Sequence, residues 1–389
     1  MRRAGTRALA LAASLSCALA ARAQTVVELR GGRAALSVEV ATVSAAGVEL
    51  RGGDLARASA DGTAFGATVP LDLVAGLQGR DRGAFGAEFA RIAEDLWRAR
   101  IRLERGDEVL AEPLVDRHWD RYRDADGPTA ALVAESRLRC ALARGDIAGS
   151  VEPWLACLRH REAGVATRFP GLAPVIDAET GLLPELSPFA PAAQRAVVVA
   201  ACEAAGKSAA TAEVAALLVR LARGEAAAAA AGRTVAEARA EARKGVPAVR
   251  ALELLVQIAG AGEAAALERA VGAFDGAFGG PANGSSKDPP GPLAAWRLAA
   301  IGTAKARIAR AVTVPERRNA ELSRAALDLL AVPASGLDRT GLVDAYAFEL
   351  AAQLMKESGE PTGAAQLEEL ARSAAGSRGA TGVQRGETP

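Results

Sequence analysis

The sequence predicts a mainly α protein, in which stacked antiparallel helical hairpins follow a small N-terminal β domain. Half of the 389 residues are hydrophobic but only 4% are aromatic, so alanine, the strongest helix former, supplies much of the apolar surface. Apolar and polar residues alternate near the N-terminus, and apolar residues then recur every three to four positions from Phe85 onward. Gly-Asp and Gly-Glu steps interrupt this helical pattern at spaced intervals.

The first 23 residues have the pattern of a secretory signal peptide. Three arginines within the first seven residues precede an apolar run over residues 8–21, and Ala21-Arg22-Ala23 has the small-x-small form of a cleavage site. We expect cleavage after Ala23, which leaves Gln24 as the first residue of a periplasmic or secreted protein. A retained N-terminal anchor is the alternative.

The charge balance argues against some classes of partner. Without the four arginines of the signal peptide, 43 basic residues face 46 acidic ones, a net charge of −3. A protein that binds nucleic acid or anionic membranes without specificity needs a basic excess, so we expect neither. Outside the signal peptide, no stretch of transmembrane length is free of charged residues, and we expect no stable membrane span.

Cysteine and histidine usage argues against a metal site. Three cysteines follow the signal peptide, Cys140, Cys157 and Cys202, and none is paired at C-x-x-C spacing. His118 and His160 are the only histidines. A structural zinc site therefore lacks its usual ligands, and we expect no metal and no other cofactor. Thiols in helix cores are the favoured interpretation of the cysteines, and one disulfide is the alternative.

Residues 24–82 have the period-2 pattern of short strands. Leu36, Val38 and Val40 alternate with residues of the opposite face. Strands are expected over residues 26–30, around Leu36, over 48–51 and over 69–77, with turns at Gly31-Gly32, Ala46-Gly47 and Gly52-Gly53. Four or five short strands favour a small barrel, because closure removes exposed sheet edges. A β-hairpin packed on the helical body is the alternative.

This segment resembles the small Sm-like or SH3-like barrels that are often found at the N-terminus of exported proteins of planctomycete-type bacteria. The resemblance covers about 55 residues and lies in Val27-Glu28-Leu29-Arg30-Gly31-Gly32, Val38-Glu39-Val40-Ala41-Thr42-Val43, Gly47-Val48-Glu49-Leu50 and Val69-Pro70-Leu71-Asp72-Leu73-Val74. It implies a barrel fold. The RNA-contacting residues of true Sm proteins have no clear match here, so RNA binding is not implied.

Glycine followed by an acidic residue marks the predicted interhelical turns. The pairs are Gly106-Asp107, Gly145-Asp146, Gly224-Glu225 and Gly359-Glu360. Glycine suits the position just after a helix, and aspartate suits the N-cap of the next one. The first two glycines are 39 residues apart, and the next follows after 79, about twice that spacing. Periods in this range are typical of stacked helical hairpins.

The last unit resembles the tetratricopeptide repeat. The large, small and turn positions of that family are matched by Phe348, Ala351, Ala352, Met355, Gly359, Ala364 and Ala371. Glu368 departs from the pattern, because the family has a large apolar residue there. Looser matches are Ala99 and Ala111 around Gly106, and Leu138, Trp154 and Cys157 around Gly145. The resemblance implies degenerate tetratricopeptide-like hairpins over patches of residues 86–375, and an irregular all-α domain is the alternative.

Two proline-rich or glycine-rich segments divide the predicted helices. Residues 169–191 carry five prolines and cannot form one helix, and residues 276–292 have the composition of a flexible linker. The predicted organisation is a signal peptide (1–23), a β domain (24–82), helical hairpins (83–168), a bridging loop (169–191), helical hairpins (192–275), a linker (276–292), C-terminal helices (293–372) and a disordered tail (373–389).

The most concentrated polar and aromatic segment is His118-Trp119-Asp120-Arg121-Tyr122-Arg123-Asp124. One interpretation makes His118 a general base oriented by Asp120 or Asp124. The favoured interpretation is a packed side chain, because His118 shares a helical face with Val115 and Trp119. His160 is expected at a helix end, where a cation suits the helix dipole.

Other reactive residue types are interpreted structurally. The carboxylate pairs Glu94/Asp95 and Glu368/Glu369 are expected on solvated helix faces, and the four tryptophans, Trp97, Trp119, Trp154 and Trp296, are expected to fill an alanine-rich core. No known catalytic motif is found in the sequence, so no catalytic, cofactor-binding or metal residue is predicted.

The resulting functional hypothesis is a non-enzymatic protein–protein interaction scaffold of the periplasm or cell envelope. Stacked hairpins present surfaces suited to a protein or peptide segment of the envelope. A structural envelope component held through its β domain is the second hypothesis. An enzyme that uses scattered carboxylates is the third.

Overall fold

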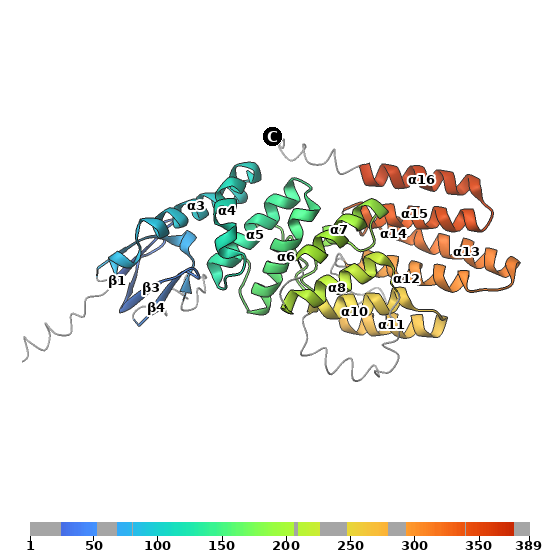
Figure 1. Ribbon diagram of the computed structural model, residues 1–389, viewed down its shortest axis with the longest axis horizontal. Helices are drawn as coiled ribbons and strands as arrows, with labels where there is room; N and C mark the ends of the chain where they lie inside the picture. The colour runs from blue at the N-terminus through green and yellow to red at the C-terminus, as the bar shows by residue number, and fades with distance from the viewer. Residues whose placement is uncertain are drawn as a thin grey trace, which may run out of the picture. The chain divides into compact units, whose positions relative to one another are not determined.

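The computed structural model describes residues 25–52, 68–79, 81–205, 209–225, 247–278, 293–338 and 340–376. The signal peptide, most of the predicted linker and most of the predicted tail lie outside these ranges. The protein is mainly helical, with a small region of antiparallel sheet near the N-terminus (Figure 1). The chain divides into two compact units, unit 1 with Met1–Cys140 and Ala163–Leu172, and unit 2 with Ala141–Glu162 and Ala173–Pro389.

The β region of unit 1 forms two three-stranded antiparallel sheets. One has the order β2-β1-β6 and the other β3-β4-β5. The strands are β1 (Thr25–Leu29), β2 (Leu36–Val38), β3 (Val40–Val43), β4 (Val48–Arg51), β5 (Thr68–Val69) and β6 (Val74–Gln78). The carboxylate of Asp81 joins the two sheets, because its Oδ2 accepts from Thr25 Oγ1 at 2.8 Å and from the Ala41 amide at 2.9 Å.

The prediction of one continuous strand over residues 69–77 is wrong, because its middle residues are not extended. Pro70 has no amide hydrogen to donate to a ladder, and residues Leu71–Leu73 form the short 3₁₀ helix η1 between β5 and β6. The two strands consequently belong to different sheets. The apolar and polar residues that alternate from Leu36 to Val40 likewise belong to two strands, because β2 ends at Val38 and β3 begins at Val40 in the other sheet.

Unit 1 continues into the helices that frame the candidate site. After the 3₁₀ turn η2 (Arg82–Ala84), α3 (Ala87–Glu104) and α4 (Glu108–Tyr122) pack against each other as a hairpin, and α5 (Pro128–Ala143) follows. The apolar period predicted for α3 is confirmed, since Ile92, Ala93 and Leu96 are buried. The α3 helix packs against η1 and β6 as well as against α4.

Unit 2 is built from helices that pack pairwise, α7 with α8, α12 with α13 and α15 with α16 (Figure 1). Its helices are α6 (Ile147–Glu162), α7 (Ala192–Ala205), α8 (Ala209–Arg223), α10 (Pro247–Gly260), α11 (Ala264–Phe278), α12 (Leu293–Arg310), α13 (Pro315–Leu329), α14 (Ala331–Ser335), α15 (Leu342–Glu357) and α16 (Pro361–Gly376).

Alanine makes close helix contacts in the core of unit 2. One cluster of buried residues from α12, α13 and α15 is Ala306, Ala309, Leu322, Ala325, Ala326, Leu329, Ala351 and Leu354. A methyl group leaves little side chain between two helix backbones, so helices with alanine faces approach closely. Leucine fills the remaining space. The low aromatic content is therefore matched by a core of small side chains.

The segment between α6 and α7 runs through turns and the 3₁₀ helix η3 (Pro184–Leu186), as its prolines predict. Within unit 2 it is fixed to α6 by polar contacts. The indole Nε1 of Trp154 donates to the carbonyl of Gly181 at 3.0 Å, and Arg161 Nη1 donates to the carbonyl of Asp177 at 2.8 Å. The part of this segment from Asp177 to Gly181 is thus held by side chains of α6.

A buried carboxylate ties η1 to the rest of unit 1. Asp72 is completely buried, and its Oδ2 lies 3.2 Å from Arg100 Nε while its Oδ1 lies 3.7 Å from Arg168 Nη2. Burial raises the pKa of Asp72, and the charges of Arg168, Arg100 and Arg33 act in the opposite direction. Three segments far apart in the sequence therefore meet at one acidic side chain.

The glycines of the four predicted turns each end a helix in a Schellman motif, and at Gly106, Gly145 and Gly359 the next helix follows directly. Gly106 has φ of 79°, its amide donates to the carbonyl of Leu103 at 3.1 Å, and the Asp107 amide donates to the carbonyl of Arg102 at 2.9 Å. The same pair of hydrogen bonds closes the helices before Gly145, Gly224 and Gly359. This pattern satisfies the last carbonyls of a helix and needs a residue in the left-handed region.

The capping role predicted for the aspartates holds at one turn and not at another. Asp146 caps α6, because its Oδ1 accepts from the Gly149 amide at 2.8 Å. Asp107 precedes α4 in the same way, but its side chain makes no capping hydrogen bond. Its backbone torsions, φ −97° and ψ 55°, differ from the extended conformation of a typical N-cap.

We expect Gly106→Val to lower the free energy of unfolding by about 1–2 kcal/mol. A Cβ added at Gly106 has no neighbour within 4 Å, so the whole cost is that of a β-branched residue at positive φ. Gly83→Val is the matched control, because Gly83 is equally open and has no positive φ. Urea titrations of both variants measure the difference, and equal midpoints would contradict the assignment of this turn.

We expect Asp146→Ala to lower the free energy of unfolding by about 1 kcal/mol through loss of the N-cap. Asp107→Ala should cost only a few tenths of a kcal/mol, because it removes a charge near a helix N-terminus and no hydrogen bond. Urea titrations of the two variants side by side test this ranking. A larger loss in Asp107→Ala would mean that Asp107 caps α4 in solution.

Candidate functional site

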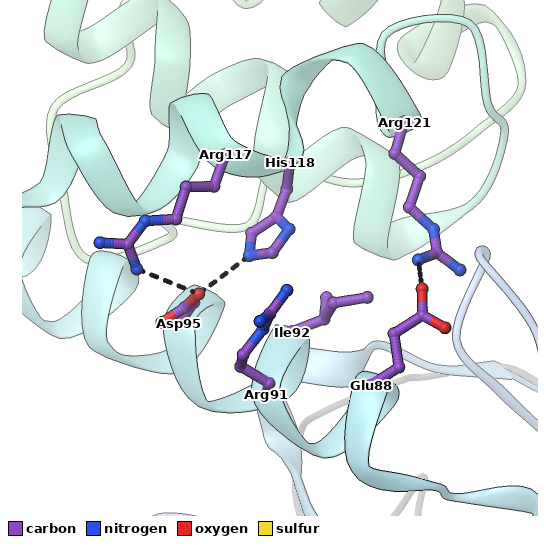
Figure 2. A pocket seen from close by; sticks show the side chains of 7 residues that line it. All are labelled: Glu88, Arg91, Ile92, Asp95, Arg117, His118 and Arg121. Atoms are coloured by element: carbon purple, nitrogen blue, oxygen red, sulfur yellow. Dashed lines mark hydrogen bonds and ion pairs between the residues drawn. The ribbon is translucent and has the colours of Figure 1, made fainter.

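The candidate site is a hollow of about 440 Å³ on the α3–α4 hairpin of unit 1. Its charged and polar side chains point toward one another from the two helices (Figure 2). Seven residues line it: Glu88, Arg91, Ile92 and Asp95 from α3, and Arg117, His118 and Arg121 from α4.

Helical spacing gathers these residues. The lining residues of α3 recur every three or four positions, so they share one face of that helix. The lining residues of α4 also share one face, because Arg121 follows Arg117 by four positions and His118 by three. The Schellman turn at Gly106 then reverses the chain, and α3 and α4 pack along each other. The two polar faces meet without any long loop.

The floor of the hollow holds a hydrogen-bonded histidine and aspartate. His118 Nε2 lies 3.1 Å from Asp95 Oδ2, and His118 and Asp95 are only 5% and 7% exposed. Because a carboxylate accepts hydrogen bonds, Nε2 carries the proton and Nδ1 is an acceptor. In Figure 2 the second ring nitrogen is turned away from Asp95.

The surroundings favour the neutral imidazole. Burial is the largest cause that lowers the pKa of His118 below 6.5, and the charges of Arg91 and Arg117 act in the same direction. The hydrogen bond and the charge of Asp95 oppose this shift. His118 is therefore an uncharged base near neutral pH.

The rim of the hollow is made by two ion pairs between the helices. Arg121 pairs with Glu88, and Arg117 Nη1 lies 3.5 Å from Asp95 Oδ2. The side chains of Glu88 and Arg117 are 64% and 61% exposed, so the rim opens to solvent. The guanidinium of Arg121 also lies over the Phe89 ring, 5.4 Å from its centroid, which limits its freedom to move.

Arg91 leaves the hollow with a surplus of positive charge. Three guanidiniums face two carboxylates, and the imidazole adds no charge when it is neutral. Arg91 is exposed, and within the described part of the chain it forms no hydrogen bond or ion pair. Figure 2 shows it between the Arg117–Asp95 and Arg121–Glu88 pairs. The site is thus arranged to attract an anionic group.

Two kinds of chemistry are compatible with this geometry. The arginines can bind a carboxylate or a similar anion by paired N–H donors. The neutral His118, oriented by Asp95, can also accept a proton from a bound water or hydroxyl. The first needs only the surplus charge that the structure shows. The second needs in addition a substrate whose reacting atom lies next to Nδ1.

A smaller hollow of about 140 Å³ lies in unit 2. Its polar side chains already have partners: Thr303 Oγ1 and the Tyr346 hydroxyl are 2.8 Å apart, and Arg195 lies over the Tyr346 ring, 5.3 Å from its centroid. Arg307 reaches the carbonyls of Gly224 and Gly260. These contacts assign the side chains to packing rather than to ligand binding.

The alternative interpretation, in which Asp120 or Asp124 orients His118, is wrong. Asp120 and Asp124 are 92% and 87% exposed and lie near Arg123, whereas the aspartate that holds His118 is Asp95, from the preceding helix. The prediction of a solvated Glu94/Asp95 pair is consequently wrong for Asp95. Its spacing from Ile92 and Ala99, both buried, was the signal, because it places Asp95 on the inner stripe of α3.

Other sequence predictions about these residue types are confirmed in large part. His118 is packed as expected. His160 lies in the last turn of α6, as expected, and its side chain is buried, with 2% exposed. Trp119, Trp154 and Trp296 are buried, while Trp97 is half-buried beneath Arg30.

The three cysteines of the described region lie buried on α5, α6 and α7 and are not joined by a disulfide, so the disulfide alternative is not realised. Burial raises the pKa of Cys140 and of Cys202 to about 12. Across the described ranges, no three His, Cys, Asp or Glu side chains come together in a way that could hold a metal ion. The helices that the structure describes include none with the length and apolarity needed to span a membrane.

No family model, no curated protein and no solved structure matches this chain.

We expect the stability contributed by His118 to depend on pH. Its pKa is lowered in the folded state, so the unfolded chain binds the proton more readily and stability is lost as pH falls below about 6.5. His118→Gln should cost roughly 1 kcal/mol at pH 7.5, and the difference from the wild type should shrink between pH 7 and pH 5. Urea titrations across this range measure both; a constant difference would mean that His118 is not buried as a neutral base.

Proposed function

We propose that the protein is a non-enzymatic interaction scaffold of the periplasm or cell envelope that binds a protein or peptide segment. The observation that carries the proposal is the arginine-rich hollow on the α3–α4 hairpin. Its charged rim is open to solvent, and its position on two packed helices provides a rigid frame for recognition. The signal-peptide pattern supports the location.

We propose in addition that the hairpins are degenerate tetratricopeptide-like units. The recurrence of one Schellman turn at Gly106, Gly145, Gly224 and Gly359 supports this, because repeats of this kind use the same turn in each unit. The pairwise packing of neighbouring helices agrees with it.

We also propose that the β region is a small Sm-like or SH3-like barrel. It is supported by Asp81, which bridges the two sheets by hydrogen bonds to Thr25 and Ala41. The apolar side chains of Val27, Val48 and Val69 are completely buried, as the inner faces of two facing sheets require.

One observation favours a second candidate function. The His118–Asp95 hydrogen bond provides an oriented neutral base beside arginines that could hold an anionic substrate. A hydrolytic enzyme would use such a base to activate water. We rank this candidate below the scaffold, because binding an anion requires only the surplus charge, whereas catalysis also requires a substrate placed next to His118 Nδ1.

We expect the mature chain, residues 24–389, to capture a defined protein from envelope extract and to show no turnover in a hydrolase screen. His118→Gln should retain that capture, because the arginines supply the charge. Affinity capture followed by mass spectrometry tests the first outcome. Turnover that His118→Gln abolishes without unfolding the chain would replace the scaffold by the enzyme, and recovery of the protein only in the insoluble envelope fraction would favour a structural component.

A further inference from the structure

The α3–α4 hollow has a charge pattern that selects its ligand. Two of its three arginines are already paired with carboxylates that line it, Arg121 with Glu88 and Arg117 with Asp95. Arg91 stands between these pairs (Figure 2). Its guanidinium can therefore take a new partner without breaking an existing ion pair.

We infer that this hollow binds the side-chain carboxylate of an acidic protein segment, with Arg91 as the residue that pairs with it. The inference rests on the proposed scaffold function and names the chemistry of the bound partner. A guanidinium offers two parallel N–H donors that match the two oxygens of a carboxylate.

The acidic residues that line the hollow argue for a singly charged group. The surplus is one positive charge, and the carboxylates of Glu88 and Asp95 would repel a dianion such as a phosphate monoester. A carboxylate carries a single negative charge and balances the surplus. The neutral His118 on the floor adds no further charge to attract a dianion.

The surroundings argue for a side chain on a longer segment rather than a free small acid. A hollow of about 440 Å³ is larger than one carboxylate needs. Leu110 of α4 is 53% exposed and lies two helical turns before Arg117 on the same face. In an extended segment with alternating acidic and apolar residues, an acidic side chain could pair with Arg91 while an apolar side chain contacts Leu110.

The test uses fluorescence anisotropy with the mature full chain and a labelled hexapeptide of alternating leucine and glutamate. Arg91→Gln should weaken binding at least about ten-fold, the loss expected for a charge-assisted hydrogen bond. Arg98→Gln is the matched control, since Arg98 lies on α3 and does not line the hollow, and it should bind as the wild type does. The same peptide with glutamine in place of glutamate should not bind measurably.

Equal binding by wild type and Arg91→Gln would overturn the inference, and so would equal binding of the glutamine peptide. Free glutarate separates the two sources of carboxylate: it should compete only at concentrations far above those of the peptide, and displacement at equal concentration would overturn the assignment to a protein segment. Circular dichroism of Arg91→Gln should overlay on the wild type, because Arg91 is exposed.

The envelope-capture experiment separates this inference from the function on which it rests. Loss of capture in Arg91→Gln, with capture retained in Arg98→Gln, would support both. Unchanged capture in Arg91→Gln would overturn the inference and leave the scaffold in place. Absence of capture by the wild type, with the peptide still bound, would count against the scaffold alone.

Discussion

The buried contact between Asp72 and the guanidiniums around it is the constraint on which unit 1 depends. Asp72 has no exposed surface, and the side chains of Arg100 and Arg168 are only 12% and 16% exposed. Removing one of these arginines would leave the burial of the Asp72 carboxyl group less compensated, and breaking a buried ion pair in this way typically costs about 3–5 kcal/mol. The two sheets, α3 and the segment Ala163–Leu172 are therefore held in one arrangement by polar geometry as well as by apolar packing.

This constraint sets the orientation of α3. Arg100 on one side of the helix is held by Asp72, and Glu94 is held by Arg30 of the β region at 2.5 Å. With these contacts made, the stripe that carries Arg91 and Asp95 is presented to α4. The β region consequently has a role in the candidate site although none of its residues line it.

Much of the fold follows from local rules that operate within a few residues. The helical period of α3 and the glycine of the Gly106 turn could be predicted because their physical causes lie within one or two helical turns of sequence. The break of the last strand at Pro70 follows from a missing amide hydrogen and could have been predicted as well. The capping difference between Asp107 and Asp146 could not, because it depends on torsions that the tertiary packing sets.

The candidate site was predicted only in part for the same reason. His118 was recognised as packed, but its partner Asp95 is 23 residues away in sequence and reaches it through the packing of two helices. Carboxylates are common on helix surfaces, so the residues around Asp95 do not identify it as the partner of His118. Only its place on the buried face of α3 sets it apart from the other carboxylates. The surplus charge at Arg91 appears only once the pairing of the other two arginines is known.

The buried thiols give each unit a natural reporter of its own opening. Cys140 belongs to unit 1, where its Sγ donates to the carbonyl of Glu108 at 3.6 Å, and Cys202 belongs to unit 2. With pKa values near 12, neither thiol supplies the thiolate that a disulfide reagent needs. Each reacts only when its helix separates from its neighbours, so the rates of thiol exchange at the two positions measure how often each unit opens under native conditions.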